Sequence, residues 1–430
     1  MKKLIFPLFF FIPFYLFGID IVGDVKLTKS WYIIKDNWSP DNDAFNTLDI
    51  TVNDSADDNI KFKAGFQLRY YDYENITNTD NLKYTESDSF ILIPKEIWLE
   101  IYDIPFENIS FKVGKQLFEW GTADGIHPAS VLNPDDFSNP FVLSKIPVWA
   151  ADLSYILDPV KISGIWIPQF SPARLPGYFK LFDYSSFQQQ GILISGIKEN
   201  IKMPVYREEF AAHIDFSLDC IDFSLGYFKG YDYIMSAENL IYTMDTFNKF
   251  FLNAVYTYPE LKVYTFDAAT SIAGAGFWFE AGIYDYNKES MSIITPSGKE
   301  QVELFSGKPY ASYIFGSDYS FENGFYLNIQ YSYGLGYTRG ENNLTDYILL
   351  LNKYTLFDIA TVELMNTFEW NRRVNIKNNY GYMLSQSLNI ELTDNFSLDI
   401  IMTEIDGYGK VLFKNWKEYD NFTFEFKYSF

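Results

Sequence analysis

The last ten residues of the chain, NFTFEFKYSF, alternate strictly between polar and aromatic side chains. A period of two is typical of a β-strand that has one apolar face and one polar face. The length is also informative, because a strand that crosses a bilayer at a tilt of about 45° needs roughly 9 to 11 residues. The aromatic residues all fall on one face: Phe422, Phe424, Phe426, Tyr428 and Phe430. The segment therefore predicts a β-strand long enough to span a membrane.

The same alternation recurs over the whole chain. In residues 325–337 it follows the pair Asn323-Gly324, which favours a tight hairpin turn. It is also present in residues 62–70, 97–101, 109–117, 210–218, 277–283 and 384–392. Counting such segments predicts about 16 strands, and about 14 to 18 are compatible with the even number of a single-chain barrel. Residues 259–276 leave the parity open, because a turn fits at Pro259-Glu260, at the glycine-rich end, or at both.

Two all-β architectures produce this pattern, and the connections distinguish them. A soluble sandwich has short strands, and its loops need not alternate in length. Transmembrane β-barrels have short turns at one end and long loops at the other, and they close because hydrocarbon offers a strand edge no hydrogen-bond partner. In this chain the short connections are residues 103–107, 158–160, 322–324 and 393–395, and the long polar ones are residues 73–90, 121–146, 171–206, 232–248 and 287–307.

We therefore expect an all-β fold, a transmembrane antiparallel up-and-down β-barrel with a polar lumen. Outward-facing aromatic residues would meet lipid, and the opposite face of each strand would line the lumen. The charged or titratable residues assigned to the lumen face are Lys61, Lys63, Arg69, Glu96, Glu100, Lys112, His213, Asp215, Glu280, Glu363 and Glu391.

The N-terminus and the composition fit this architecture. Lys2 and Lys3 precede an uncharged apolar run, so we expect residues 1–18 to be a signal peptide and residues 19–430 to be one barrel domain in the outer membrane of a diderm bacterium. No later stretch of 18 uncharged apolar residues predicts a membrane helix. The net charge of -22 argues against nucleic acid as a partner, and the single Cys220 excludes an intramolecular disulfide.

One long connection stands out, because no helix or strand period follows Trp120 in the segment VGKQLFEWGTADGIHPASVLNPDDF. The segment resembles a family of largely uncharacterised bacterial outer-membrane barrels that are similar to alginate-export-type porins. That family carries Gly-Arg-Gln, then Trp-Gly, then Asn-Pro-x-Asp at similar spacing. The matching positions are Gly114, Lys115, Gln116, Trp120, Gly121, Asn133, Pro134 and Asp136. Lys115 departs from the family's arginine, which puts a bidentate ion pair at that position in doubt.

The resemblance and the place of the segment between two strands predict a loop folded into the lumen. Asp124, Asp135 and Asp136 would form an acidic rim, and Lys61, Lys63, Arg69 and Lys112 would face it from the wall, separated by Glu96 and Glu100. Opposed rows of charge would create a transverse field that selects polar solutes. The alternative is that these groups pair within the wall and that the loop is a plug. Gly114, Gly121 and Gly125 would serve backbone turns in either case.

Other chemistry has little support in the sequence. His127 lies near Asp124 and the pair Asp135-Asp136, but a lone histidine in an acidic loop is more often solvated, so we expect no metal and no cofactor. His213 alternates with Ala211 and Asp215 and is expected on the lumen face. Glu96 and Glu100 share a strand face, but no nucleophile, base and orienting group can be assembled, so no enzyme is expected.

We therefore expect a channel for passive or weakly selective passage of small hydrophilic solutes, with cation preference. One alternative is a carrier of hydrophobic compounds, for which Trp98, Trp278 and Tyr284 are lumen candidates; another is a plugged surface barrel that binds a partner through its external loops. Expected partners are outer-membrane lipid, small solutes, and the barrel-assembly machinery acting on the strand that ends at Phe430. An oligomer is compatible with the pattern, because a subunit interface would be an apolar face like the one toward lipid.

Overall fold

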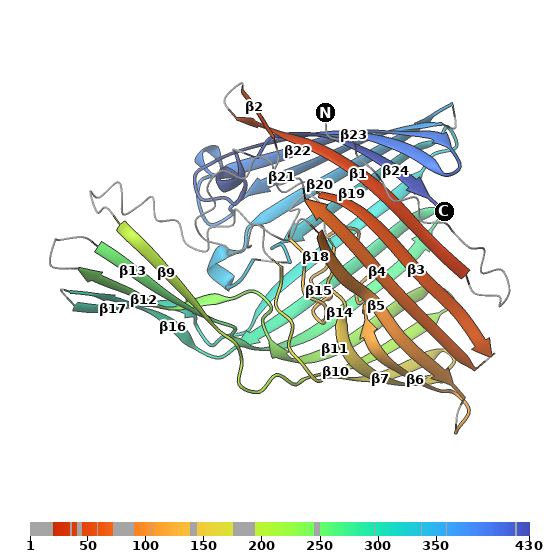
Figure 1. Cartoon of the computed structure of the whole chain (residues 1–430), viewed down its shortest axis with the longest axis horizontal. Helices are drawn as coiled ribbons and strands as arrows, with labels where there is room; N and C mark the ends of the chain where they lie inside the picture. The colour runs from red at the N-terminus through yellow and green to blue at the C-terminus, as the bar shows by residue number, and fades with distance from the viewer. Residues whose placement is uncertain are drawn as a thin grey trace.

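The computed structural model describes residues 20–34, 37–40, 45–57, 59–71, 90–103, 105–137, 144–174, 194–244, 250–296, 298–336, 338–357, 359–417 and 419–430. The expected signal peptide, residues 1–18, and the connection at residues 73–89 lie outside these residues. Within the described part of the chain, almost all regular structure is β-strand (Figure 1). The exceptions are three short 3-10 helices, η2 (Glu341–Asn343), η3 (Ile376–Asn378) and η4 (Phe413–Trp416). Among the described residues, no helix has the length and apolar character needed to cross a membrane.

The described strands build a closed antiparallel barrel. Each barrel strand pairs with its neighbours in chain order, and β1 pairs with both β3 and β24, which completes the ring. The first nine strands are β1 (Asp20–Ile34), β3 (Phe45–Asp57), β4 (Ile60–Tyr71), β5 (Phe90–Tyr102), β6 (Ile109–Gln116), β7 (Val148–Leu157), β8 (Val160–Ile167), β10 (Glu209–Leu218) and β11 (Ile221–Tyr231). The others are β14 (Glu260–Ile272), β15 (Ala275–Tyr286), β18 (Tyr310–Ser320), β19 (Phe325–Tyr333), β20 (Asp346–Leu356), β21 (Ala360–Trp370), β22 (Tyr380–Thr393), β23 (Phe396–Tyr408) and β24 (Asn421–Ser429).

The barrel described here has 18 strands rather than the predicted 16. A further short strand, β2 (Asn37–Pro40), folds back onto β1 and is not part of the ring. The turn in residues 259–276 is at both ends: Tyr258 and Pro259 precede β14, and Ala273 and Gly274 join β14 to β15. Alternation alone does not fix the number of wall strands, because it indicates strand-like segments but not which of them pair with one another in one ring.

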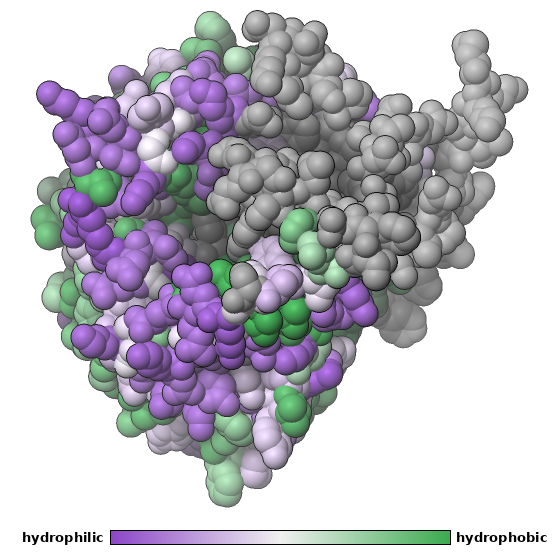
Figure 2. All heavy atoms as spheres, turned by 90° about the vertical axis from the view of Figure 1, so that its left-hand side faces the viewer, coloured by the Kyte–Doolittle hydropathy of each residue, from purple (hydrophilic) through white to green (hydrophobic). Residues whose placement is uncertain are grey.

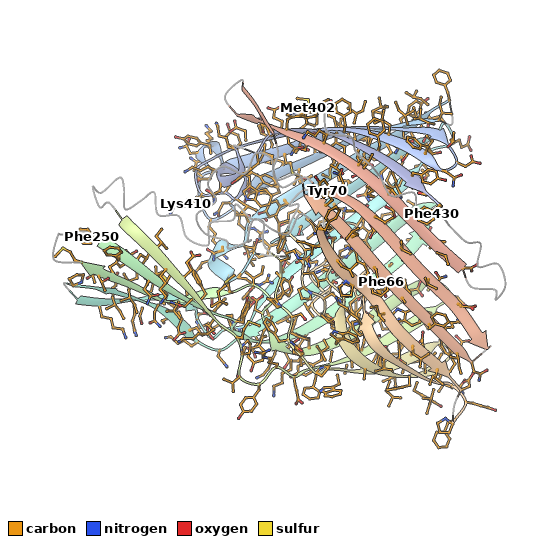
Figure 3. The ribbon with its side chains drawn as sticks, viewed as in Figure 1. Phe66, Tyr70, Phe250, Met402, Lys410 and Phe430 are labelled. Atoms are coloured by element: carbon orange, nitrogen blue, oxygen red, sulfur yellow. The ribbon has the colours of Figure 1, made fainter. Side chains whose placement is uncertain are left out.

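Those outer strands correct a second prediction. Three connections expected to be long polar loops, residues 171–206, 232–248 and 287–307, contain strands of a separate five-stranded sheet. Its strands are β9 (Ile194–Lys202), β12 (Ser236–Met244), β13 (Phe250–Thr257), β16 (Glu289–Thr295) and β17 (Gly298–Phe305), in the order β17-β16-β12-β13-β9. In Figure 1 the sheet projects to the left of the barrel, and in Figure 3 Phe250 marks its distal part. We call this sheet the extension.

The two faces of the barrel strands differ as the alternation predicts. Phe66 on β4 is 41% exposed and Met402 on β23 is 42% exposed, and both lie on the outside of the barrel (Figure 3). On the terminal strand, Phe426 and Tyr428 are exposed. Thr423 lies on the opposite face, where its hydroxyl shares a hydrogen bond with the Ser30 hydroxyl inside the barrel. Phe430 pairs with Gly23 through two backbone hydrogen bonds of 2.9 Å, so the last residue takes part in closing the ring. A bilayer would remove these outward-facing aromatic side chains from water.

The two ends of the barrel also differ. The predicted short connections at residues 103–107, 158–160, 322–324 and 393–395 are turns at one end, and Gly324 has the positive φ of 82° that its turn requires. The described parts of the long connections, including the extension, lie at the other end (Figure 1). Figure 2 looks onto that end and shows mostly hydrophilic residues around a hollow.

Candidate functional site

The connection between β6 and β7, residues 117–147, folds into the barrel, and its base is held by Asn133. We call these residues the inward loop; the structure describes them except 138–143. The Asn133 side chain is fully buried and accepts a hydrogen bond from the backbone N–H of Phe118 at 2.7 Å. Its amide donates to the backbone oxygens of Gln116 at 3.1 Å and Ile146 at 2.9 Å. One side chain thus joins the two ends of the loop.

The middle of the inward loop is held by Glu280 on β15, on a part of the wall that is not adjacent to β6 or β7. The fully buried Glu280 carboxylate accepts the backbone N–H groups of Thr122 and Ala123, each at 3.1 Å, and of Ala129 at 2.6 Å. His127 Nδ1 lies 3.4 Å from the same carboxylate. Hydrogen bonds from N–H groups to an ionised acceptor are roughly twice as strong as neutral ones, so Glu280 clamps the loop across the lumen.

Trp120 and Gly121 bring the loop against this wall. The Trp120 indole stacks on the His213 ring of β10, with ring centroids 4.4 Å apart. Gly121 has a φ of 96°, and a Cβ there would collide with the Glu280 carboxylate. This contact confirms the predicted lumen position of His213. It also explains the pair Trp120-Gly121: the indole ring stacks on His213, and the glycine leaves room for the Glu280 carboxylate.

Asp135 and Asp136 do not form the free acidic rim that the sequence predicts. Asp136, only 6% exposed, pairs with Arg69 of β4 at 3.1 Å and with Arg174 at 2.5 Å. Asp135 pairs with Lys145 at 2.7 Å. Both carboxylates are therefore neutralised, Asp136 by Arg69 of the wall and by Arg174, and Asp135 by Lys145 of the loop itself, and they hold the loop instead of facing solvent.

Tyr233 joins the inward loop to the base of the extension. Its hydroxyl donates to Asp135 at 2.7 Å, and its ring lies under the Arg339 guanidinium, 5.1 Å from centroid to Cζ. Burial, and then the neighbouring Asp135 carboxylate, raise the pKa of the Tyr233 hydroxyl well above its ordinary value. The hydroxyl therefore remains a hydrogen-bond donor at neutral pH.

The remaining predicted loop residues lie farther along. Pro134 contributes its backbone oxygen, which accepts from the Ile146 N–H at 2.7 Å. Asp124 is exposed, and its carboxylate accepts from the Asn328 amide of β19 at 3.1 Å. Gly125 has a φ of 84°, which confirms its role in a turn. Lys115, in place of the expected arginine, donates to the backbone oxygen of Pro94 at 2.6 Å.

A second segment enters the barrel that sequence reasoning missed. Glu369 on β21 is fully buried, and its carboxylate accepts the backbone N–H groups of Leu412 at 2.8 Å and Phe413 at 2.9 Å, between β23 and β24. Phe413 lies in one apolar cluster with Ala123 and Ile126 of the inward loop. The sequence does place Glu369 on the polar face of an alternating strand. It does not indicate the partners of Glu369, because these are backbone N–H groups, which leave no pattern in the sequence.

The lumen wall has an asymmetric charge distribution. Cross-strand register with Glu280 assigns the lumen-facing positions of β10, β11, β14, β15, β18 and β19, all of whose residues the structure describes. None of these positions is Lys or Arg, and the acidic ones are Glu209, Asp215, Asp222, Asp267, Glu280 and Asp318. We call these six strands the acidic wall.

The predicted wall cations all lie on the other side, on strands β4 to β6. β18 lies halfway round the ring from β4. Lys63 pairs with Glu96, which also accepts from the Trp98 indole at 3.1 Å. Lys112 lies 4.0 Å from the centroid of the same Trp98 ring.

The other two charges of this side interact with polar neighbours. Lys61 lies 4.9 Å from the Tyr102 ring centroid, and Glu100 accepts from the Ser110 hydroxyl at 2.8 Å. Glu96 and Glu100 therefore have separate partners and do not form a pair. On the rest of the wall, Glu363 pairs with Lys353 at 2.9 Å, and Glu391 lies near the end of β22. Among the described residues, no group of three or more His, Cys, Asp or Glu side chains is arranged to hold a metal ion.

Comparison with known proteins identifies the fold. No protein-family model and no curated protein sequence matches the chain. The structure is similar to OccK9 (OpdG) of Pseudomonas aeruginosa, with a TM-score of 0.54, 9% identity, and coverage of 96% of this chain and 98% of that one. It is similar to OccK2 (OpdF) of Pseudomonas aeruginosa in complex with glucuronate, with a TM-score of 0.53, 8% identity, and coverage of 96% and 97%. It is also similar to a BenF-like porin from Pseudomonas fluorescens Pf-5, with a TM-score of 0.51, 7% identity, and coverage of 96% of this chain and 98% of that one. The fold is that of an outer-membrane porin.

Proposed function

We propose that this protein is an outer-membrane channel for small hydrophilic solutes, that it prefers cations, and that the inward loop narrows its lumen. The observation that carries the proposal is the path of the loop. It is clamped by Glu280 on the acidic wall and by Arg69 on the cation-bearing side, so it crosses the space that a solute must pass. A narrow passage between an acidic wall and a wall with lysines exerts a transverse field on a polar solute.

Cation preference follows from which charges remain unpaired. The acidic wall offers carboxylates such as Asp222 and Asp318, and its six strands carry no lumen-facing Lys or Arg. On the other side, cations alternate with acids, as in the Lys63–Glu96 pair, so their charges largely cancel. Field lines are focused in a narrow, low-dielectric passage, and the net negative sign raises the local concentration of cations.

The similar structures support a porin fold. One of them is a complex with glucuronate, a small hydrophilic molecule. The motif around Trp120 and Asn133 remains a prediction of kinship with alginate-export-type porins. The terminal strand ending at Phe430 is the proposed segment that the barrel-assembly machinery recognises.

A plugged barrel is the second candidate, and one observation favours it. Ala123 and Ile126 of the inward loop pack with Phe413 of the segment held by Glu369, so two segments from different connections touch inside the barrel. A carrier of hydrophobic compounds is less favoured, because the lumen-facing Trp278 lines a cavity together with carboxylates.

The test is single-channel conductance of the refolded protein in a planar bilayer under a KCl gradient. Steady conductance with a cation-selective reversal potential is expected. Residues 122–131 are replaced by a short glycine-serine linker, which keeps the hydrogen bonds of Asn133 at the base of the loop. This replacement should raise the conductance. The matched control replaces residues 291–302 of the extension by the same linker and should leave conductance unchanged. Silence before the replacement and current after it would identify a plug.

A further inference from the structure

A cavity of about 320 Å³ lies on the short-turn side of the inward loop. Its walls come from the loop and from the ends of four strands of the acidic wall, where these strands meet the short turns. Its lining residues include Asp124, Gly276, Trp278, Asp318, Tyr326 and Asn328. The volume is at the lower end of the roughly 300 to 1,000 Å³ of small-molecule sites. A small solute that has passed the loop would therefore meet a cavity of its own size.

The cavity has negative charge without compensation. Two of its lining residues, Asp124 and Asp318, are carboxylates, and none of them is Lys, Arg or His. Within the described residues, no ion pair to either aspartate is present among the salt bridges. A cation entering this cavity would be attracted by both carboxylates at once.

The hydrogen-bonding capacity left in the cavity is that of an acceptor. Asp318 accepts from the backbone N–H of Gly276 at 3.1 Å and from the Tyr326 hydroxyl at 2.9 Å. The Asn328 amide N–H₂ donates to Asp124 at 3.1 Å and to the Tyr326 oxygen at 3.2 Å. The hydrogen-bond donors nearest to the two carboxylates are therefore already engaged in hydrogen bonds within the protein.

Asn328 gives an independent observation. The residue is 1% exposed, and its side-chain carbonyl oxygen Oδ1 has no hydrogen-bond partner among the described residues. A buried acceptor without a partner is unfavourable, so a ligand that donates a hydrogen bond to this oxygen would be stabilised there. The Trp278 indole completes the lining, and indoles attract cations placed over the ring.

We infer that this cavity binds the primary ammonium group of a small organic cation. A primary ammonium has one positive charge and three N–H donors, which matches two carboxylates and one unpartnered amide oxygen. A hard metal ion fits less well, because Ca²⁺ takes six to eight oxygen ligands and Mg²⁺ needs octahedral geometry. The inference rests on the proposed channel, because the cavity is reached through the lumen.

The test measures binding directly and does not depend on conductance. Ethylammonium is titrated with refolded protein in deuterated detergent micelles at pH 7, and broadening of its methylene proton resonances gives the dissociation constant, expected on the order of 1 mM. Tetramethylammonium carries the same charge without an N–H donor and is expected to bind at least tenfold more weakly. Acetate should not bind.

Variants locate the site. Asp318→Asn and Asn328→Leu should each weaken ethylammonium binding about tenfold, with heat-modifiable gel mobility showing that the barrel is folded. Asp222→Asn removes the same charge from the acidic wall outside the cavity and should change binding less than twofold. Equal binding of ethylammonium and tetramethylammonium, or equal effects of Asp318→Asn and Asp222→Asn, would overturn the inference and leave only a diffuse field.

The reversal potential separates this inference from the proposed function. Cation-selective conductance without ethylammonium binding would refute the ammonium site and keep the channel. Binding by a protein that conducts no current would refute the channel and keep the site.

Discussion

Replacement of Glu280 by glutamine tests whether one carboxylate holds the inward loop across the lumen. Glutamine has nearly the same shape, but only one of its two terminal atoms accepts hydrogen bonds. If its oxygen faces Thr122 and Ala123, its N–H₂ group faces the Ala129 N–H, so one of the three bonds is lost and two donors oppose each other. Glu280→Gln therefore weakens loop docking in every orientation of the amide.

The magnitude follows from the three bonds. A bond to an ionised acceptor contributes about 1.5–3 kcal/mol and a neutral bond about 0.5–1.5 kcal/mol. Losing one charged bond and converting two to neutral ones costs about 3.5–6 kcal/mol, and release of a buried charge offsets part of it. A net loss of about 3 kcal/mol would raise the undocked fraction of the inward loop roughly a hundredfold.

Thiol labelling reads that fraction. Ser130 in the loop is 6% exposed, and the only natural cysteine is Cys220. In a background with Cys220→Ser and Ser130→Cys, Glu280→Gln should raise the labelling rate by about two orders of magnitude and increase channel noise. The matched control is Glu363→Gln, which removes a lumen carboxylate bonded to Lys353. Wild-type labelling and conductance in the Glu280→Gln protein would refute the clamp.

Four further outcomes are expected. Asn133→Ala removes three buried hydrogen bonds at the base of the loop, so a protease should cut the loop while the barrel stays folded, as seen by gel mobility. Glu369→Gln should expose the segment between β23 and β24 to the protease and leave the inward loop protected. Lys112→Gln should raise, and Asp267→Asn lower, the permeability of K⁺ relative to Cl⁻, measured as opposite shifts of the reversal potential. Phe66→Arg puts a charge on the exposed outer face and should destabilise folding into liposomes by about 2–4 kcal/mol in urea titrations, and an unchanged midpoint would contradict an outward, lipid-facing position.

The wall of the barrel could be read from the sequence because side-chain alternation is a local property. Phe426 and Thr423 fall on the faces that the period of two predicts, and Gly324 forms the predicted turn. The strand count could not be read in the same way. β12 and β16 alternate like barrel strands, and only the pairing partners, which are distant in the chain, separate the extension from the wall.

The site was predictable in position and not in its contacts. The pause in alternation after Trp120 located the inward loop, and His213 was placed on the correct face. The partners of Asp135 and Asp136 could not be found, because they depend on where the loop crosses the lumen. Glu280 carried only the signal of a polar face, since its partners are backbone N–H groups and every residue but proline has one.

The extension has a consequence for the order in which this chain can fold. Its strands come from three separate connections, and the pairings between connections, β9 with β13 and β12 with β16, are parallel. Parallel pairs between distant segments cannot start from a local hairpin, and contacts at long sequence separation form slowly. The three connections are brought together only after β8 has paired with β10, β11 with β14, and β15 with β18. We therefore expect the extension to be the last part to form, so that its completion fastens six neighbouring strands at one rim.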